Sequence, residues 1–264
     1  MTNIVVLIKQ VPDYEDRHLT DGDWTLDRAG SDPVLDEINE KAVEVALQLK
    51  EKYTDAEYNV VVLTAGPASA ETAIRRALSM GADSAYHLVD DGMHGSDIVQ
   101  TSWALARSLG QIEDIGVVIA GNETSDGVGG AVPAILAQFL GLPQLTAMRK
   151  IDLADGKVTG ERETDDGVFG LEATLPAIIS ISEKIVEDAR FPSFKGIMAA
   201  KKKPVSKLTL AEIGVEADEV GGANSSSKVV ASTPKPPKTA GEKITDEGEG
   251  GTKIAEYLVA QKIL

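Results

Sequence analysis

The chain has 264 residues, and only 4% of them are aromatic although 42% are hydrophobic, so a buried core must consist mainly of Val, Ile, Leu and Ala. Its formal net charge of −16 argues against a nucleic-acid partner, because a phosphate backbone requires a basic surface. The same charge argues against binding to anionic membrane surfaces. Cysteine is absent, which excludes disulfides, thiolate catalysis and cysteine-ligated zinc or iron–sulfur centres.

The sequence shows no targeting segment and no metal-binding pattern. The N-terminal apolar run, within MTNIVVLIKQ, is too short for a signal peptide and lacks a cleavage site. No run of 18 apolar residues occurs, so we expect no membrane insertion and a cytoplasmic location. His18, His87 and His94 show no ligand spacing, so no metal site is predicted.

The first half of the chain alternates strand and helix patterns. Residues 4–8 form a continuous apolar run, which is typical of a strand buried on both faces. The polar stretch over residues 9–33 is expected to form a loop or a hairpin, and apolar residues then recur at helical spacing between residues 36 and 51. The alternation continues with strands at 58–63, 85–89 and 116–120 and helices at 69–80, 96–109 and 131–140. This order predicts an α/β fold with an open, mostly parallel sheet and helices on both faces.

The second half departs from this alternation. Three short strand patterns separated by Asp-Gly turns predict a small antiparallel addition, at residues 148–153, 157–163 and 168–174. Another buried strand is expected at 177–181. Residues 220–251 are rich in Gly, Ser, Pro and Lys, a composition that buries too little apolar surface to order itself. We therefore predict an α/β domain over residues 1–219 and an irregular C-terminal arm over 220–264, whose short amphipathic end helix docks on a partner or on its own domain.

Ligands of open parallel sheets bind at the carboxyl ends of the strands, and three of these ends can be compared. Lys9-Gln10-Val11 has no glycine and so lacks the turn that brings a dinucleotide pyrophosphate against the backbone. Ala65-Gly66-Pro67 is a tight turn that a flat ring could approach. Residues 121–130 (GNETSDGVGG) are the richest in glycine and open a helix, so their backbone N–H groups and the helix dipole favour a phosphate.

Glycine spacing does not by itself decide this site. The run Gly127-Val128-Gly129-Gly130 is also compatible with a plain turn from a strand into a helix. Neither Lys-Ser nor Lys-Thr follows the glycines, so the loop is not a Walker P-loop. Carboxylates are too abundant for any acid–base pair to stand out. The residues alone therefore predict an acidic α/β protein with a phosphate-binding loop and a docking arm.

Several segments resemble the electron-transfer flavoprotein β subunits, in the same order and over nearly the whole chain. They are Asn3-Ile-Val-Val-Leu-Ile-Lys-Gln-Val-Pro-Asp, Asn39-Glu-Lys-Ala-Val-Glu-Val-Ala-Leu-Gln-Leu-Lys, Ala77-Leu-Ser-Met-Gly-Ala-Asp, Gly160-Glu-Arg-Glu-Thr-Asp-Asp-Gly, Arg190-Phe-Pro-Ser-Phe-Lys-Gly-Ile-Met-Ala-Ala-Lys-Lys-Lys and Thr239-Ala-Gly-Glu-Lys. The segment that begins at Arg190 is the most specific of them, and actinobacterial members of the family look most similar.

The resemblance implies an adenine-nucleotide α-hydrolase-like fold without hydrolase activity, in which the β subunit binds AMP and the α subunit makes most contacts to FAD. Tyr14 matches a tyrosine beside the flavin ring. Animal members carry Asn, Phe and Cys at the positions of Asp36, Ile38 and Asn39, so backbone contacts are the ones expected to carry over. The family's AMP positions fall on Leu7, Asp36, Glu37, Ile38, Asn39, Ala65, Gly121, Asn122, Glu123, Thr124, Ser125, Asp126, Gly127, Val128, Gly129, Gly130, Ala131 and Val132.

The resemblance also implies partners. The chain would form a heterodimer with an electron-transfer flavoprotein α subunit, on which residues 220–264 would dock. Electrons would arrive from acyl-CoA and other flavin dehydrogenases and pass to the respiratory chain through a quinone oxidoreductase. A recognition loop over residues 183–203 would meet the dehydrogenase, with Phe194 as its apolar anchor unless that side chain packs into its own domain. The residues expected to bind this partner are Arg190, Phe194, Ile197 and Met198.

Bifurcating members of the family place a second FAD where others hold AMP, and their loop carries Thr-Ala-Gln-Val-Gly after the Asp-Gly. Here Asp126-Gly127 is followed by Val-Gly-Gly-Ala-Val, so we expect AMP. Two other interpretations stay open. One is a non-redox nucleotide-binding module of the stress-protein kind, and the weaker one is an NAD-dependent dehydrogenase, whose G-x-G-x-x-G fingerprint is absent. As a flavoprotein subunit the chain would be an electron carrier, not an enzyme with its own substrate.

Overall fold

A computed structural model describes residues 2–233, 236–237, 240–241, 243 and 245–264. The chain forms two compact units, Met1–Val229 and Val230–Leu264. The first unit extends ten residues beyond the expected boundary at 219: Val220 is buried in one cluster with Leu88 and Ile213, and Ser226 donates its backbone N–H to Asp97. Thr239 and Glu242, from the last of the segments that resemble the flavoprotein family, lie outside the described residues.

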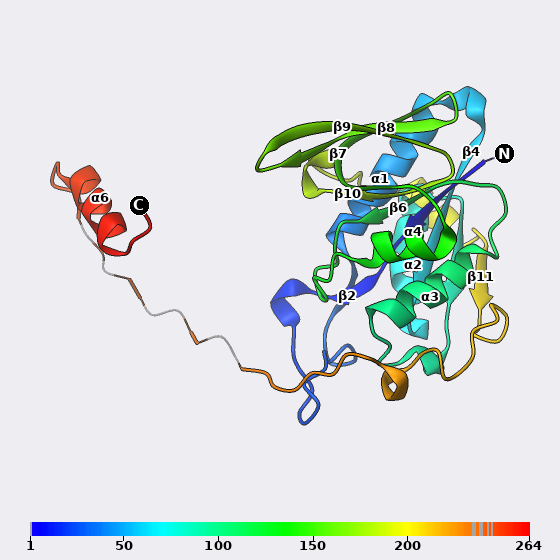
Figure 1. Ribbon diagram of the computed structural model, residues 1–264, viewed down its shortest axis with the longest axis horizontal. Coiled ribbons are helices and arrows are strands. Elements are labelled where there is room, and N and C mark those ends of the chain that lie inside the picture. The colour runs from blue at the N-terminus through cyan, green and yellow to red at the C-terminus, as the bar shows by residue number, and fades with distance from the viewer. Residues whose placement is uncertain (1, 234–235, 238–239, 242, 244) are drawn as a thin grey trace. The chain divides into compact units, whose positions relative to one another are not determined.

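Within the described residues, the first unit contains a nine-stranded sheet in the order β11-β5-β4-β1-β6-β10-β7-β8-β9 (Figure 1). At one end of the sheet, β8 (Lys157–Thr164) and β9 (Gly167–Thr174) pair antiparallel. The expected open, mostly parallel sheet with an antiparallel addition is thus confirmed. The strands that pair in parallel are β1 (Thr2–Leu7), β4 (Tyr58–Ala65), β5 (Ser84–Leu88), β6 (Ile115–Gly121), β7 (Gln144–Ala154), β10 (Ala177–Ile181) and β11 (Val205–Leu208).

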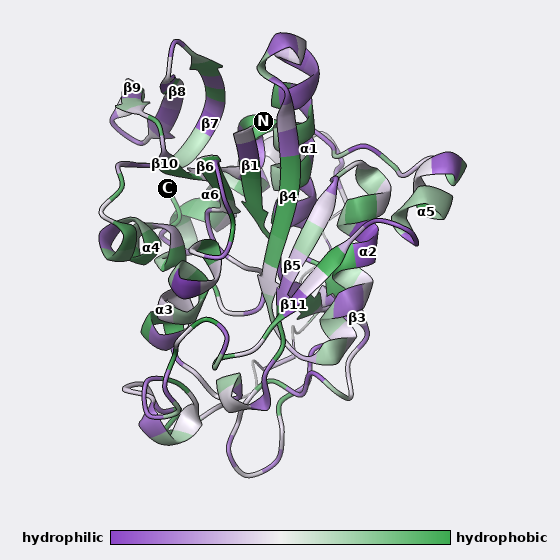
Figure 2. Cartoon of the chain, turned by 90° about the vertical axis from the view of Figure 1, so that its right-hand side faces the viewer, coloured by the Kyte–Doolittle hydropathy of each residue, from purple (hydrophilic) through white to green (hydrophobic). Residues whose placement is uncertain are grey.

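Helices cover both faces of this sheet, as predicted. Figure 2 shows α1 (Glu37–Lys52) and α2 (Glu71–Met80) on one side of the strands and α3 (Ile98–Leu109) and α4 (Val132–Leu140) on the other. Successive strand residues point to opposite faces, so a strand covered on both sides must be apolar throughout. In β1, Val6 packs into the core under α1 and α2, whereas its neighbour Val5 packs under α3 and α4.

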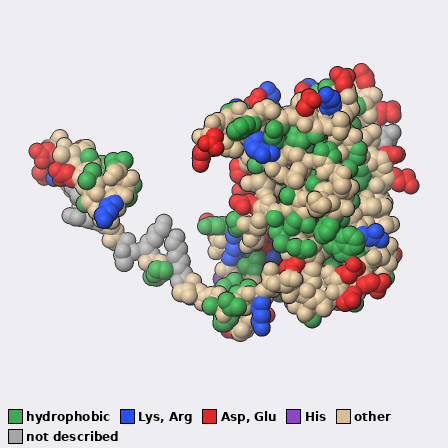
Figure 3. All heavy atoms as spheres, in the orientation of Figure 1, with side chains coloured by type: hydrophobic (Ala, Val, Ile, Leu, Met, Phe, Trp, Pro, Cys, Tyr) green, Lys and Arg blue, Asp and Glu red, His purple; other side chains and the backbone are tan. Residues whose placement is uncertain are grey.

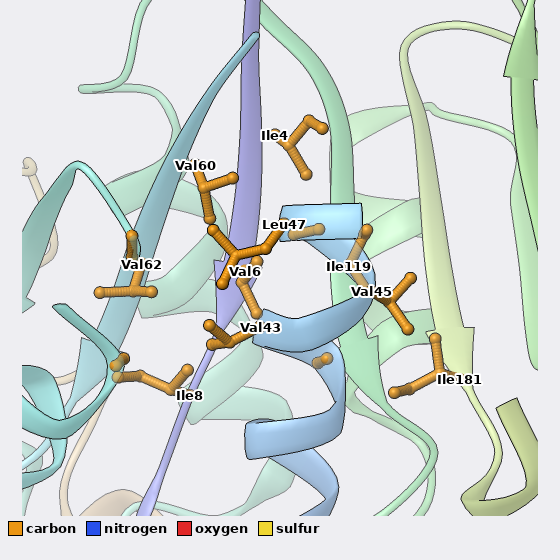
Figure 4. Close-up of a cluster of buried hydrophobic side chains, with 14 of the residues drawn as sticks. Ile4, Val6, Ile8, Val43, Val45, Leu47, Val60, Val62, Ile119 and Ile181 are labelled. Carbon is orange, nitrogen blue, oxygen red and sulfur yellow. The ribbon is translucent and has the colours of Figure 1, made fainter. Parts of the chain in front are cut away.

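The core on the α1 side is built from branched aliphatic residues. Val43, Val45 and Leu47 of α1 lie over Val6 and Ile119 of the sheet (Figure 4). All five are at most 5% exposed. Each such burial contributes about 1.5–3 kcal/mol, so α1 is held firmly and its first turn has a fixed position at the edge of the sheet.

A strand and a helix of the first unit, β11 and α5 (Phe194–Ala200), were not predicted from the sequence patterns. The strand β11 extends the sheet beside β5, and α5 interrupts the expected loop. In addition, β7 begins at Gln144, four residues before the predicted start, because its first residues pair with β10.

The polar stretch after β1 is bounded by a second sheet. The strands β2 (Gln10–Pro12) and β3 (Pro33–Leu35) pair antiparallel, and a short 3-10 helix, Tyr14–Asp16, lies between them in sequence. The second unit contains α6 (Gly250–Ala260), whose Ile254, Tyr257 and Val259 side chains are exposed. Among the helices that the structure describes, none is both long enough and apolar enough to cross a membrane.

Candidate functional site

The three strand ends singled out in the sequence meet at one edge of the sheet. β1 lies between β4 and β6 and runs parallel to both, so Leu7, Ala65 and Gly121 end their strands on the same side. This is the edge at which ligands of open parallel sheets bind.

The first turn of α1 lies against this edge. The backbone N–H of Asp36, the N-cap residue, donates to the carbonyl of Lys9 at 3.1 Å. The Asn39 Oδ1 accepts the backbone N–H of Lys9 at 2.7 Å, and both Asp36 and Asn39 are buried. A Cβ at Gly121 would lie 2.7 Å from Cγ2 of Ile38, so only glycine allows β6 to end this close to α1. Glu37, in contrast, is exposed.

The carboxylate of Asp36 faces the loop between β6 and α4 and does not cap its own helix. Its Oδ2 accepts the backbone N–H of Ser125 at 2.9 Å. Burial raises the pKa of Asp36, and the nearby charge of Asp126 adds to this shift, whereas the hydrogen bond from Ser125 opposes it. Asp36 therefore fixes the middle of the loop relative to α1.

Asp126 is the electrostatic centre of the loop. Its side chain is fully buried, and its two oxygens accept hydrogen bonds from Lys9 Nζ at 2.8 Å and from Arg28 Nη2 at 2.7 Å. The backbone N–H of Gly127 also donates to Oδ1, at 2.7 Å. Burial disfavours the charged carboxylate, but the charge of Lys9 and the hydrogen bonds from Lys9, Thr124 and Arg28 outweigh it and hold the pKa of Asp126 well below its usual range.

The end of the loop presents backbone N–H groups at the start of α4. Val128 and Gly130 have positive φ angles of 47° and 61°, a conformation that turns successive amides toward one side. Among the described residues, the N–H groups of Gly129, Gly130, Ala131 and Val132 have no hydrogen-bond acceptor. Together with the positive end of the α4 dipole, these free donors suit an anionic group such as a phosphate.

The remaining loop residues line the approach to these amides. Asn122 donates its backbone N–H to Ile181 O at 2.9 Å, and its Oδ1 is buried without a hydrogen-bond partner among the described residues. Glu123 is exposed on the same loop. The Oγ1 of Thr124 accepts the N–H of Gly127 at 3.4 Å, which closes the turn.

Tyr14 lies on the 3-10 helix Tyr14–Asp16, and 80% of its surface is exposed. The guanidinium of Arg17 stands 5.0 Å from the centre of its ring. Arg17 Nη1 in turn donates to the carbonyl of Ser125 at 2.5 Å. The segment that carries Tyr14 is therefore attached to the candidate nucleotide loop, and its ring is free to contact a further group.

The residues expected to bind a dehydrogenase form a separate surface on α5. Ser193 caps this helix by accepting the N–H of Gly196 at 3.1 Å. A Cβ at Gly196 would lie 2.4 Å from the carbonyl oxygen of Ser79, so glycine allows α5 to pack directly on the end of α2. Phe194 is 81% exposed, which excludes the alternative that it packs into its own domain. Ile197 and Met198 are about half exposed beside it.

Arg190 acts within its own chain. Its Nε donates to Oε2 of Glu44 at 2.7 Å, and its Nη1 donates to Oε1 of Glu51 at 2.5 Å. Glu44 is buried in α1, and although burial opposes its ionisation, hydrogen bonds from Arg190 and Gln48 hold its pKa below the usual range. The structure thus shows Arg190 fixing the start of the recognition segment, and its contact with a partner stays a prediction.

Three cationic residues of the site were missed in the sequence. Lys9 follows a buried strand directly, and its position at the end of that strand could have indicated that it belongs to the site. Arg17 and Arg28 lie in the aperiodic segment before β3, where no pattern indicates their partners. The described residues contain no cluster of His, Asp and Glu side chains that could hold a metal ion.

Comparison with known proteins identifies the family. Residues 23–213 match the electron transfer flavoprotein domain. The electron transfer flavoprotein β subunits of Mycobacterium tuberculosis and Mycobacterium leprae are 71% and 70% identical to the chain, over 100% of both sequences in each case. The β subunit of Megasphaera elsdenii is 32% identical over 99% of each chain.

The chain therefore belongs to the electron-transfer flavoprotein family. Within it the chain is similar to the β subunits over its full length, and a β subunit is part of an electron carrier that pairs with an α subunit, not a catalyst with its own substrate. This assignment removes the two other interpretations, the stress-protein-like module and the NAD-dependent dehydrogenase.

Proposed function

We propose that this β subunit binds AMP in the loop between β6 and α4. The observation that carries the proposal is the row of backbone N–H groups from Gly129 to Val132, which have no acceptor among the described residues. Their positions are fixed by Asp36 and Asp126, so the loop is organised before a ligand arrives. A phosphate would accept from these amides, and the ends of β1 and β4 would flank the base.

The residues of the loop also favour AMP over a second flavin. After Asp126-Gly127 the chain reads Val-Gly-Gly-Ala-Val, which lacks the Thr-Ala-Gln-Val-Gly run expected of electron-bifurcating members. The first strand end, Lys9-Gln10-Val11, has no glycine turn for a pyrophosphate. A mononucleotide with one phosphate fits the row of backbone N–H groups from Gly129 to Val132 and needs no glycine turn for a pyrophosphate.

We further propose that the chain and an α subunit together house FAD, with most contacts made by the α subunit. When bound, FAD supplies the redox chemistry by accepting and releasing electrons. The contribution of this chain is Tyr14, whose exposed ring is held by Arg17 at the outer side of the nucleotide loop. No glycine-rich dinucleotide cradle is present in the sequence, which supports a shared site.

The proposed route of electrons begins at the recognition segment. Acyl-CoA and other flavin dehydrogenases would dock on α5 through Phe194, with Ile197 and Met198 around it. A groove of about 500 Å³ between this segment and α2, lined by Phe191, Ile197 and Arg75 among others, would extend the contact. A quinone oxidoreductase would then take the electrons to the respiratory chain.

The phosphate loop can be tested with Gly129→Glu. A Cβ at this position would already lie 2.9 Å from Ile98, and the new carboxylate would repel a phosphate. One anion–dipole interaction contributes about 0.3–2 kcal/mol, and loss of several amide contacts costs more. We expect the heterodimer to lose its AMP and keep its FAD, as measured by chromatography of a denatured extract.

The matched control is Gly170→Glu on β9, where nothing lies within 4 Å of the added Cβ. It introduces the same charge far from the loop in sequence and should leave the AMP content unchanged. An unchanged AMP content in the Gly129→Glu protein would contradict the placement of the phosphate.

A further inference from the structure

The turn that follows β4 is held from beneath by a buried histidine. His87 lies in β5, is 0% exposed, and pairs in register with Thr64 of β4. Its Nε2 lies 3.0 Å from the carbonyl oxygen of Gly66. The backbone N–H of Gly66 donates to Leu88 O, also at 3.0 Å, so β5 holds both polar groups of this glycine.

The hydrogen bond to Gly66 determines which tautomer the His87 ring adopts. A carbonyl oxygen only accepts, so the proton must be on Nε2 of His87. The Nδ1 has no hydrogen-bond partner among the described residues, which leaves the contact with Gly66 as the one that orients the ring. Burial lowers the pKa of His87, and the ring therefore stays neutral at pH 7.

The position of this turn relates it to the nucleotide site. Ala65 ends β4 beside the end of β1, and Gly66 follows it without a side chain that would keep a flat ring away from the backbone. On its outer side the turn is held by Gln10, whose Nε2 donates to Ser69 O at 2.7 Å. Without His87, Gly66 would keep only one of its two hydrogen bonds to β5, the one from its backbone N–H to Leu88 O.

We infer that His87 is a positioning residue of the nucleotide site: by donating from Nε2 to Gly66 O it fixes the backbone of Ala65 and Gly66 in the conformation that receives the base. The inference rests on the proposed binding of AMP. His87 is buried and would not itself touch the ligand, so it would act through the backbone of Ala65 and Gly66.

The test uses the heterodimer with the α subunit, stripped of nucleotide and titrated with AMP in a calorimeter. His87→Leu removes the donor at similar volume, and His87→Asn places its amide near the Nδ1 position, out of reach of Gly66. Both should raise the Kd for AMP about tenfold, the effect of one lost hydrogen bond. His87→Gln places an amide donor near the Nε2 position and should restore the Kd to within about threefold of the wild-type value.

Thr64→Val is the control for disturbance of the core. Thr64 is buried beside His87, and its Oγ1 has no partner among the described residues, so the change should leave the Kd unchanged. Unaltered AMP binding by His87→Leu and His87→Asn, or equal loss in the Gln variant, would overturn the inference while the proposed function stands. A wild-type heterodimer that binds no AMP would instead contradict the proposed function, and this inference with it.

Discussion

Asp126 joins three segments that are distant in the sequence. Its oxygens accept from Lys9 after β1 and from Arg28 before β3, and its own backbone belongs to the loop that leads to α4. Removing one partner of a buried ion pair costs more than the pair contributes, because the other charges are left uncompensated. We therefore expect the carboxylate of Asp126 to hold in place the loop that leads to the N–H groups at the start of α4.

We predict that Asp126→Asn lowers the free energy of unfolding at pH 7 by about 2–3 kcal/mol, a value reduced for the partial exposure of both cations. The pKa of Asp126 is lowered from its usual 3.8, so its contribution to stability is present above pH 3.8 and is lost progressively as the pH falls below it. Urea unfolding between pH 7 and pH 3 should show the difference from wild type shrinking below about pH 4.

Asp55→Asn provides the control, because Asp55 is exposed in the turn between α1 and β4. It should behave like the wild type at every pH. If Asp126→Asn lowered the free energy of unfolding by the same amount at pH 3 as at pH 7, ionisation of the carboxylate would not be the source of the effect.

The backbone part of the site was more predictable than its side-chain network. Glycines after a buried strand and before a helix have few structural explanations, and the structure has Gly121 at the end of β6 and Gly129 and Gly130 in the loop before α4. The bonds from Arg17 to Ser125 and from Arg28 to Asp126 were not predictable, since each spans about a hundred residues and starts in an aperiodic segment. Long-range pairing of this kind is set by the tertiary fold.

At the scale of elements, α5 determines what the recognition segment can present. The capping by Ser193 and the close contact of Gly196 with Ser79 hold a helix of two turns on the surface of α2. Arg190 fixes the chain that leads into it. An exposed aromatic side chain on a firmly packed helix is typical of a residue that anchors a protein partner.

We predict that Phe194→Ala changes the free energy of unfolding by less than about 0.5 kcal/mol, because the side chain is exposed. Docking of a dehydrogenase should weaken by about 2–4 kcal/mol, the range for hot-spot residues. The measurement is the apparent KM for the flavoprotein in dehydrogenase turnover, which should rise, while reduction of the flavin by dithionite stays normal.

Phe169→Ala on β9 is the comparison, since Phe169 is also exposed but lies on another element. It should leave the KM unchanged. The anchor assignment is wrong if Phe194→Ala keeps full coupling to the dehydrogenase or mainly lowers the Tm.

Most elements of the large sheet and its covering helices followed from periodicity, whereas β11 and α5 did not, for physical reasons. Val205–Leu208 is four residues long and contains a serine and a lysine, so its apolar pattern is too short to indicate an edge strand. Phe194–Ala200 contains Gly196, which lowers helix propensity. The glycine is there for the close packing on Ser79, and such a contact cannot be foreseen from local sequence.

At the scale of the whole molecule, one face of the first unit exposes hydrophobic side chains. On the face of the first unit that carries α3 and α4, hydrophobic side chains gather while Asp and Glu lie mainly at the rim (Figure 3). Val99 and Phe139 are exposed there, and with Trp103 they line a groove of about 350 Å³. Near the end of the first unit, Ser226 donates its backbone N–H to the carboxylate of Asp97 at the start of α3.

The part of the arm that forms the second unit, Val230–Leu264, is predicted to contribute to assembly with the α subunit. Truncation after Val229 keeps the buried Val220 and the bond from Ser226 to Asp97, so the first unit should stay folded. Loss of the exposed apolar residues of α6 should raise the Kd for the α subunit at least about tenfold, which corresponds to about 1.4 kcal/mol. Sedimentation of the truncated and full-length chains with the α subunit measures this change in Kd, and equal affinities would show that residues 230–264 do not bind the partner.

We have proposed that this chain binds AMP and needs the α subunit to hold FAD. The most direct measurement is to purify the chain alone and together with the α subunit by gel filtration, record the flavin absorbance, and identify the nucleotides released on denaturation. We expect a yellow heterodimer that releases FAD and AMP in equal amounts, and a colourless isolated chain. FAD retained by the isolated chain, or a heterodimer that releases twice as much FAD and no AMP, would contradict it.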